Sequence, residues 1–200
     1  GAARAIDGLG PIHAEAWAPA GGTRAGALER ARVSVPFDTG VRAINALTTF
    51  GLGQRVGVIA GSGVGKSVLI DMIARGADAD VVVVGLIGER AREVSDFVAR
   101  HMGGDAAGPD GTARRAMTAL VAVPADDAPN LRLRGAMQAT ALAEYFRAQG
   151  KRVLLILDSL TRVAHAAREI GLLLGEPGAA RGYPPSALAT ITRLVERAGN

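Results

Sequence analysis

The stretch Gly61-Ser62-Gly63-Val64-Gly65-Lys66-Ser67 decides the fold, because it joins an expected buried strand over residues 55–60 to an expected helix. Glycines in this context let successive backbone N–H groups curl around phosphates, while the new helix directs its positive end at them. Lys66 would then reach the terminal phosphates, and Ser67 would supply a magnesium ligand. Ala60 replaces the usual first glycine, and its small side chain still permits the turn. The alternative, a glycine-rich turn without function, is disfavoured by this combination.

Strands and helices alternate along the rest of the chain. We expect strands over residues 81–86, 118–123 and 152–158, and helices over residues 90–101 and 130–149. Continuous apolar strands separated by helices indicate a parallel sheet buried on both faces. Ligands of such sheets bind beyond the carboxyl ends of the strands, and the residues of chemical interest fall there.

The first part of the chain differs from the rest in composition. Residues 1–32 are rich in glycine, alanine and proline and show no sustained periodicity, so we interpret them as a linker. From Val33 the pattern changes, and Asp38 is expected to cap a short helix that runs to about Thr48. Residues 102–115, which are rich in glycine, are expected to form a mobile surface loop.

Composition excludes several classes of function. The chain has no cysteine, which excludes disulfides and thiol nucleophiles and makes a reducing cytoplasm the natural compartment. The longest apolar runs are far shorter than the ~20 residues of a membrane-spanning helix. The net charge is +4, but the basic residues are scattered and aromatic residues make up only 4%, so nucleic-acid binding is not expected. His13, His101 and His165 show no metal-ligand spacing.

Lysine is rare in this chain, and one of the two lysines lies in the glycine-rich turn. Only Lys66 and Lys151 accompany the many arginines. A lysine kept where almost every other cation is arginine suggests that a compact point charge is needed at that position. The composition therefore supports a phosphate-binding role for Lys66.

Two carboxylates follow apolar strands. Asp158 ends the strand 152–158 and would hold magnesium through a water, although an Asp at this place can also cap a helix. Glu89 directly follows the apolar run 81–87 and could polarise a water that attacks the terminal phosphate. It could equally be a first-turn acid paired with a neighbouring arginine. Arg162, Arg168 and Glu169 are expected on a solvated helix face.

Read in order, six stretches resemble the flagellar and type III secretion ATPases, a family related to the catalytic subunit of rotary ATP synthases. They are Ala60–Ser67, Gly85–Arg90, Leu157–Arg162, Arg168–Gly171, Arg181–Ser186 and Leu194–Gly199. The resemblance extends from about Val33 to Asn200. Val163, Gly178 and the stretch 187–192 depart from the family's usual residues and leave the subfamily open.

The resemblance implies an α/β fold, namely a RecA-like P-loop NTPase core with a mostly parallel sheet flanked by helices, truncated at both ends relative to the family. Residues 1–32 would be the end of an N-terminal β-barrel and a linker. Residues 33–200 would be the ATPase core without its C-terminal part and without the family's C-terminal domain. The family's arginine finger and part of its adenine pocket would lie beyond Asn200.

The resemblance also implies roles for individual residues, with ATP and Mg²⁺ as cofactors. Glu89 would be the catalytic carboxylate, Arg90 a charged neighbour near the phosphates, Asp158 the Walker B acid and Arg162 its cationic partner. Glu93 would support the water network. The segment 181–186 resembles a loop through which neighbouring subunits sense one another.

The function implied is ATP hydrolysis that energises protein export through a flagellar type III secretion apparatus. An injectisome ATPase and the catalytic subunit of a rotary proton-translocating ATP synthase are the alternatives. A non-catalytic subunit would lack the carboxylate at Glu89, and a regulatory GTPase would need an Asn-Lys-x-Asp motif that the sequence lacks. Expected partners are further copies in a hexameric ring, export-apparatus proteins and chaperone–substrate complexes. The expected location is cytoplasmic, with peripheral association to the membrane only through the apparatus.

Overall fold

The computed structural model describes residues 5–6, 10, 17–22, 26, 28, 30–61, 63–102 and 117–199. Most of the expected linker and the loop expected over 102–115 lie outside these residues. The described elements, in chain order, are β1 (Pro36–Phe37), α1 (Arg42–Leu47), β2 (Phe50–Gly51), α2 (Lys66–Gly76), β3 (Val81–Ile87), α3 (Ala91–Met102), β4 (Met117–Val123), α4 (Pro129–Ala148), β5 (Val153–Asp158), α5 (Leu160–Leu173), the 3₁₀ turn η1 (Ala180–Gly182) and α6 (Pro185–Arg197).

A parallel sheet in the order β4-β3-β5 forms the centre of the described structure. The register pairs Val81 of β3 with Met117 and Val153, so the three strands start level. Every residue of β3 is buried, since β3 has a neighbour on each side and helices on both faces. This confirms the expected α/β fold with a parallel sheet. It also brings the carboxyl ends of β3 and β5 together, because Leu86 pairs with Asp158.

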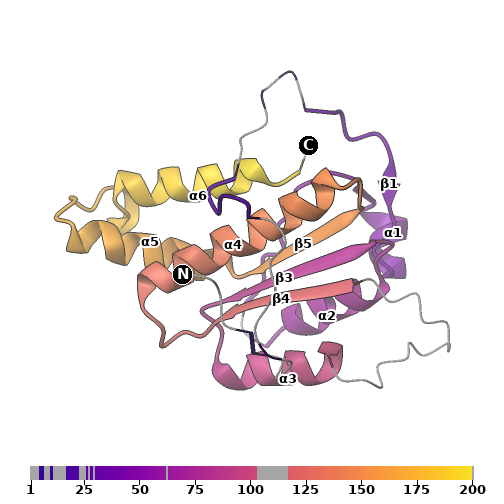
Figure 1. The fold of residues 1–200 in the computed structure, drawn as a ribbon, viewed down its shortest axis with the longest axis horizontal. Helices are drawn as coiled ribbons and strands as arrows, with labels where there is room; N and C mark the ends of the chain where they lie inside the picture. The colour runs from indigo at the N-terminus through magenta and orange to yellow at the C-terminus, as the bar shows by residue number, and fades with distance from the viewer. Residues whose placement is uncertain are drawn as a thin grey trace.

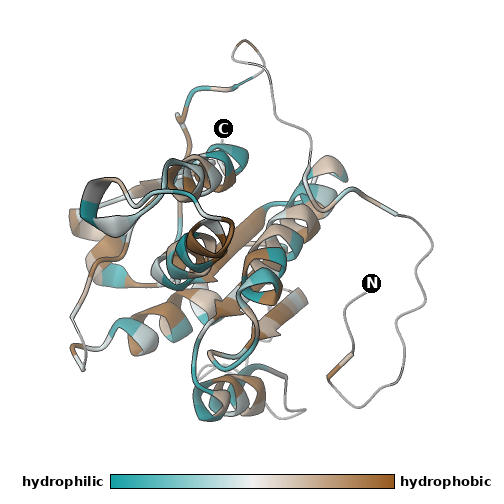
Figure 2. Cartoon of the chain, turned by 90° about the vertical axis from the view of Figure 1, so that its left-hand side faces the viewer, coloured by the Kyte–Doolittle hydropathy of each residue, from teal (hydrophilic) through white to brown (hydrophobic). Residues whose placement is uncertain are grey.

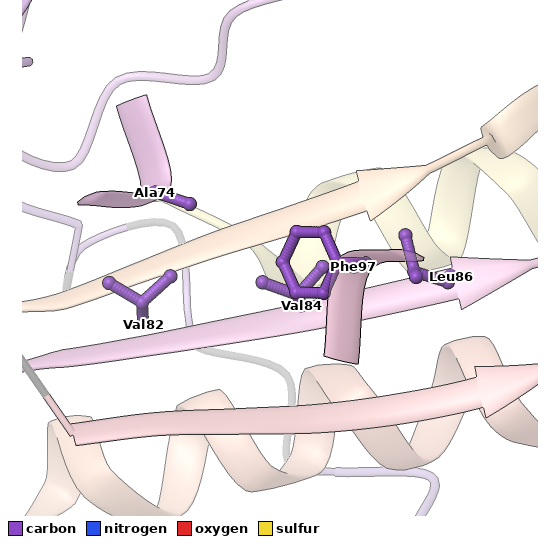
Figure 3. Close-up of a cluster of buried hydrophobic side chains, with 5 residues drawn as sticks. All are labelled: Ala74, Val82, Val84, Leu86 and Phe97. Atoms are coloured by element: carbon purple, nitrogen blue, oxygen red, sulfur yellow. The ribbon is translucent and has the colours of Figure 1, made fainter. Parts of the chain in front are cut away.

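Helices cover the two faces of the sheet unequally. In Figure 1, α2 and α3 lie along one face and α4 along the other, while α5 and α6 extend beyond the strands. Figure 3 shows how α2 and α3 pack on their face of the sheet: Ala74 of α2 and Phe97 of α3 contact Val82, Val84 and Leu86 of β3. Figure 2 shows hydrophobic colour along the strands and both colours on the helices, as expected for amphipathic helices packed on a sheet.

Small residues let α4 approach the opposite face closely. Ala136, Ala139 and Ala143 are buried there. A Cβ placed on Gly135 would lie 2.4 Å from Cγ2 of Val123 at the end of β4, so this position excludes any side chain. The close approach positions the N-terminal half of α4 beside the carboxyl edge of the sheet.

The strand expected over residues 55–60 is not present. These residues have no strand assignment, and Val56, Val58 and Ile59 are exposed. A strand requires a partner for its backbone groups, and the free edge of β5 has no such partner among the described residues. The apolar pattern of this segment reports a preference for burial, but pairing is decided by the neighbouring strand.

Asp38 also behaves differently from the expected helix cap. The N-cap of α1 is Val41, which makes no side-chain capping bond. Asp38 Oδ1 instead accepts hydrogen bonds from the Gly40 amide at 2.7 Å and from Asn45 Nδ2 at 2.6 Å. The carboxylate therefore closes the turn that precedes the helix, which is a common use of Asp beside a glycine.

Candidate nucleotide site

Lys66 and Asp158 meet at the carboxyl edge of the sheet. Lys66 is the first residue of α2 and Asp158 the last residue of β5, and Lys66 Nζ forms an ion pair with Asp158 Oδ1. The Asp158 side chain is 8% exposed and that of Lys66 28%. Folding thus brings together two residues 92 positions apart. Asp158 does not cap α5, whose N-cap Ser159 also makes no side-chain capping bond.

The backbone before α2 contains two glycines in the left-handed region. Gly63 has a φ of 77° and Gly65 a φ of 95°, a region that favours glycine. The N-cap of α2 is Gly65, which has no side chain to accept a hydrogen bond from the first N–H groups of the helix. Gly61, Val64 and Ser67 are exposed. Ser62, the other expected phosphate-binding residue, lies outside the described residues.

Glu89 is held beside this turn by the end of β4. The Gly88 amide donates to the Val123 carbonyl at 2.7 Å, and the Ala125 amide donates to the Glu89 carbonyl at 3.1 Å. Gly88 has a φ of 75°, and a Cβ there would lie 2.7 Å from Cβ of Arg162. Both facts require glycine immediately before the carboxylate. The backbone at Glu89 is therefore held by hydrogen bonds to the segment at the end of β4, and Arg162 packs against the preceding Gly88.

The surroundings of Glu89 disfavour its ionised form. Burial raises the pKa of Glu89 above its ordinary value, and the negative charge of Asp158 and the hydrogen bond and charge of Glu93 raise it further, while Lys66 opposes them. These three side chains thus lie within electrostatic reach of Glu89. A carboxylate with a raised pKa accepts a proton more readily near neutral pH, as a general base must.

Arg90 and Arg162 are both exposed at this edge. In the part of the chain that the structure describes, neither guanidinium has an ion-pair or hydrogen-bond partner. Arg162 contacts the Gly88 position through its aliphatic carbons. The two cations are therefore free to face an anionic ligand.

The oxygen donors at this edge suit magnesium. The Ser67 hydroxyl and the Asp158 carboxylate are hard oxygen ligands, which Mg²⁺ prefers. Over the described residues, no group of three or more His, Cys, Asp or Glu side chains is placed to hold a metal ion. Mg²⁺ is commonly bound by one or two protein oxygens together with waters and substrate phosphates, so these two residues fit the ion.

Two polar contacts were not anticipated from the sequence. Arg168, expected on a solvated face, donates from Nε to the Gly182 carbonyl at 2.8 Å and lies over the ring of Tyr183. Glu169, expected on the same face, pairs with Arg132 of α4 at 2.7 Å. Arg168 thus holds the turn before α6, and Glu169 links α5 to α4. The spacing of charges along α5 gave no sign of these contacts because the partners come from other elements.

The described helices include none that is long and apolar enough to cross a membrane. Comparisons with known proteins show which family the chain belongs to. Residues 40–200 match the model of the ATP synthase alpha/beta family, nucleotide-binding domain.

Among curated relatives, the flagellum-specific ATP synthase of Pseudomonas aeruginosa is 54% identical over 200 residues, covering 100% of this chain and 43% of that protein. The type 3 secretion system ATPase of Sinorhizobium fredii is 48% identical over 196 residues, covering 98% of this chain and 42% of that protein. The chain thus spans less than half the length of these relatives.

Solved structures give the same result. The assembled ATPase EscN of the enteropathogenic E. coli type III secretion system superposes with a TM-score of 0.81 at 44% identity, covering 98% of this chain and 47% of that one. EscN has also been solved in complex with its central stalk EscO, with a TM-score of 0.80. The chain belongs to the ATP synthase alpha/beta family, in which it is similar to the flagellar and type III secretion ATPases.

Proposed function

We propose that this chain forms the phosphate-binding and hydrolytic part of an ATPase that energises protein export through a flagellar type III secretion apparatus. The observation that carries the proposal is the meeting of Lys66, Asp158 and Glu89 at one edge of the sheet. A cation at a helix start, a buried carboxylate at a strand end and a carboxylate with a raised pKa are the groups that phosphoryl transfer to water requires.

Each side chain has a role in this proposal. The backbone of residues 61–65 cradles the phosphates, and Lys66 neutralises their charge. Glu89 accepts the proton of the attacking water, while Arg90 and Arg162 offset the negative charge that develops in the transition state. Ser67 and, through a water, Asp158 would hold Mg²⁺, whose charge would neutralise the phosphate oxygens. Glu93 supports the water network beside Glu89.

Export is favoured over ATP synthesis by the similarity to type III secretion ATPases. The P. aeruginosa protein is called flagellum-specific, and the S. fredii protein is called a secretion system ATPase. The second name keeps an injectisome ATPase as the alternative. A rotary ATP synthase subunit is the remaining alternative, because the matched family model covers that group as well.

The same relatives support a proposal for the assembly and the location. Because EscN is solved as an assembled ATPase and in complex with its central stalk, we propose a homo-oligomeric, hexameric ring that contacts proteins of the export apparatus and chaperone–substrate complexes. We further propose a cytoplasmic location at the membrane-associated apparatus, without direct membrane insertion and without nucleic-acid binding.

The proposal is tested by Glu89→Gln in the native polypeptide that contains this chain. The amide is nearly the same size but cannot act as a base, so we expect turnover to fall by about 10²–10⁴-fold, with Mg-ATP affinity kept. Phosphate release per site and nucleotide titration measure the two effects. Asp126→Asn, which changes an exposed carboxylate just beyond β4, serves as the control. Equal turnover in Glu89→Gln and the unmodified protein would remove Glu89 from this role.

A further inference from the structure

On the face of the sheet that α2 and α3 cover, the buried carboxylate of Asp71 on α2 contacts two side chains of α3. His101 Nε2 lies 2.5 Å from Asp71 Oδ1, and the two side chains are 3% and 9% exposed. Arg100 Nε lies 3.3 Å from the same oxygen, while Arg75, one turn further along α2, pairs with the other carboxylate oxygen. Two consecutive residues at the end of α3 therefore bind one side chain of the helix that begins at Lys66.

The protonation of this pair follows from its surroundings. Burial raises the pKa of Asp71, but the hydrogen bond from His101 and the charges of Arg75 and Arg100 outweigh burial and leave the pKa below its ordinary value. Burial lowers the pKa of His101, although Asp71 opposes this effect. At neutral pH the carboxylate is therefore ionised and the imidazole neutral. Nε2 must then carry the ring proton, and its N–H donates a hydrogen bond to Asp71.

The imidazole is also fixed in orientation. The ring of Phe97 stacks on that of His101 with centroids 4.0 Å apart and planes at 14°. Phe97 in turn belongs to the buried cluster with Ala74 and Val84 shown in Figure 3. Ala74 lies one turn after Asp71 on α2, so the polar pair and the apolar cluster join the same two helices. The hydrogen bond adds direction to a contact that apolar packing alone would leave free to slide.

The contact between His101 and Asp71 lies at the opposite end of α3 from the candidate site. The helix starts at Ala91, two residues after Glu89, and His101 is in its last turn. With a rise of about 1.5 Å per residue, roughly 15 Å separate the two ends. Because a helix moves as a rod, a change of tilt at His101 shifts the end that adjoins Glu89. The other helix in this contact, α2, begins with Lys66 and Ser67.

We propose that Asp71 and His101 form a clamp that positions Glu89 relative to the phosphate-binding turn by fixing α3 against α2. The clamp residues are positioning residues that act through Glu89, and the inference rests on the proposed role of Glu89 in hydrolysis. The bond between them is required for turnover and contributes little to nucleotide binding, since α2 keeps its own contacts with the sheet.

The test compares His101→Phe with His101→Gln in the native polypeptide. Phenylalanine keeps an aromatic ring beside Phe97 but cannot donate to Asp71, whereas the Gln amide can donate. We expect His101→Phe to lower kcat by about tenfold or more, as small misplacements of catalytic groups do, with the Kd for Mg-ATP changed less than about twofold. His101→Gln should recover most of the lost kcat. The matched control is His165→Phe, which changes a histidine of α5 that lies near Tyr183, and it should leave kcat unchanged.

Thermal unfolding of each variant establishes that it is folded. If His101→Phe does not fold, His101→Asn replaces it, because its shorter amide cannot span the distance to Asp71. An unchanged kcat in the variant without the bond would overturn the clamp, as would equal losses in that variant and in His101→Gln. These outcomes are distinct from failure of the proposed function, which would appear as full turnover in Glu89→Gln.

Discussion

Charged side chains cluster at both ends of the strands, which we call the amino edge and the carboxyl edge of the sheet. The surroundings favour the ionised forms at the amino edge and disfavour the ionised form of Glu89 at the carboxyl edge. At the amino edge, Arg152 pairs with Asp78 and Asp80, and its backbone N–H donates to Asp80 Oδ2 at 2.8 Å. This backbone bond is the main reason that the pKa of Asp80 is lowered, and Asp78 raises the pKa of Arg152. Each charge there is stabilised by its partner.

At the carboxyl edge, burial and neighbouring carboxylates instead raise the pKa of Glu89. A carboxylate whose ionised form is disfavoured by its surroundings lowers stability at neutral pH, but it gains strength as a base. The comparison indicates that the amino edge contributes to structure and the carboxyl edge to chemistry. Four predictions test this distinction, in order of decreasing effect.

The largest effect on nucleotide affinity is expected at Lys66. In Lys66→Ala, the phosphates lose their cation and Asp158 loses its partner, so the affinity for Mg-ATP should fall by about 10–100-fold, given that charge-assisted hydrogen bonds contribute about 1.5–3 kcal/mol. Nucleotide titration measures the change. Lys151→Ala, at the exposed turn before β5, is the matched lysine control. Equal affinities in the two variants would contradict the assignment of the phosphate-binding turn.

A second prediction compares two glycines with positive φ. Gly88→Ala and Gly150→Ala both place a Cβ on left-handed backbone, with φ values of 75° and 77°, which should cost each variant about 1–2 kcal/mol of stability. The close contact with Arg162 should add a further loss in Gly88→Ala alone. Only at Gly88 would the new Cβ meet another residue, Arg162, whereas nothing lies within 4 Å at Gly150. Turnover should therefore fall about 10–100-fold in Gly88→Ala alone.

Stability and turnover are measured on the same two protein samples, by thermal unfolding and phosphate release. Equal turnover in the two glycine variants would show that the backbone before Glu89 tolerates displacement. The carboxyl edge would then be no more sensitive to geometry than the amino edge.

A third prediction concerns pH. Turnover requires ionised Glu89, so activity should decline as the pH falls through its raised pKa, at a higher pH than for an ordinary carboxylate. Glu93→Gln removes a like charge and should move this acid limb to lower pH. The measurement is kcat/KM against pH for both proteins. An acid limb that does not move would exclude Glu93 from the environment of Glu89.

The smallest effect is expected at the amino edge. Asp78→Asn removes one partner of Arg152, but the side chains are 41% and 39% exposed, so solvent already screens the pair. We expect only a slight decrease in the unfolding midpoint and unchanged turnover. A large loss of turnover would mean that the two edges are coupled through β5 and would remove the distinction drawn between them.

The sequence by itself determined the strands β3, β4 and β5 with the helices between them, the glycine-rich turn before α2, and the placement of Glu89 and Asp158 at strand ends. These features depend on local patterns: an apolar run marks a buried strand, and glycines before a helix mark an anion-binding turn. The catalytic roles assigned to Glu89, Arg90 and Arg162 remain predictions.

Only the tertiary structure decided which side chains meet. The ion pair of Lys66 with Asp158, the bond of His101 with Asp71 and the contact of Arg168 with Gly182 join residues from different elements. The apolar segment 55–60, for its part, forms no strand among the described residues. The reason is common to all four: pairing depends on what lies opposite in space, and a local pattern of residue types contains no information about that partner.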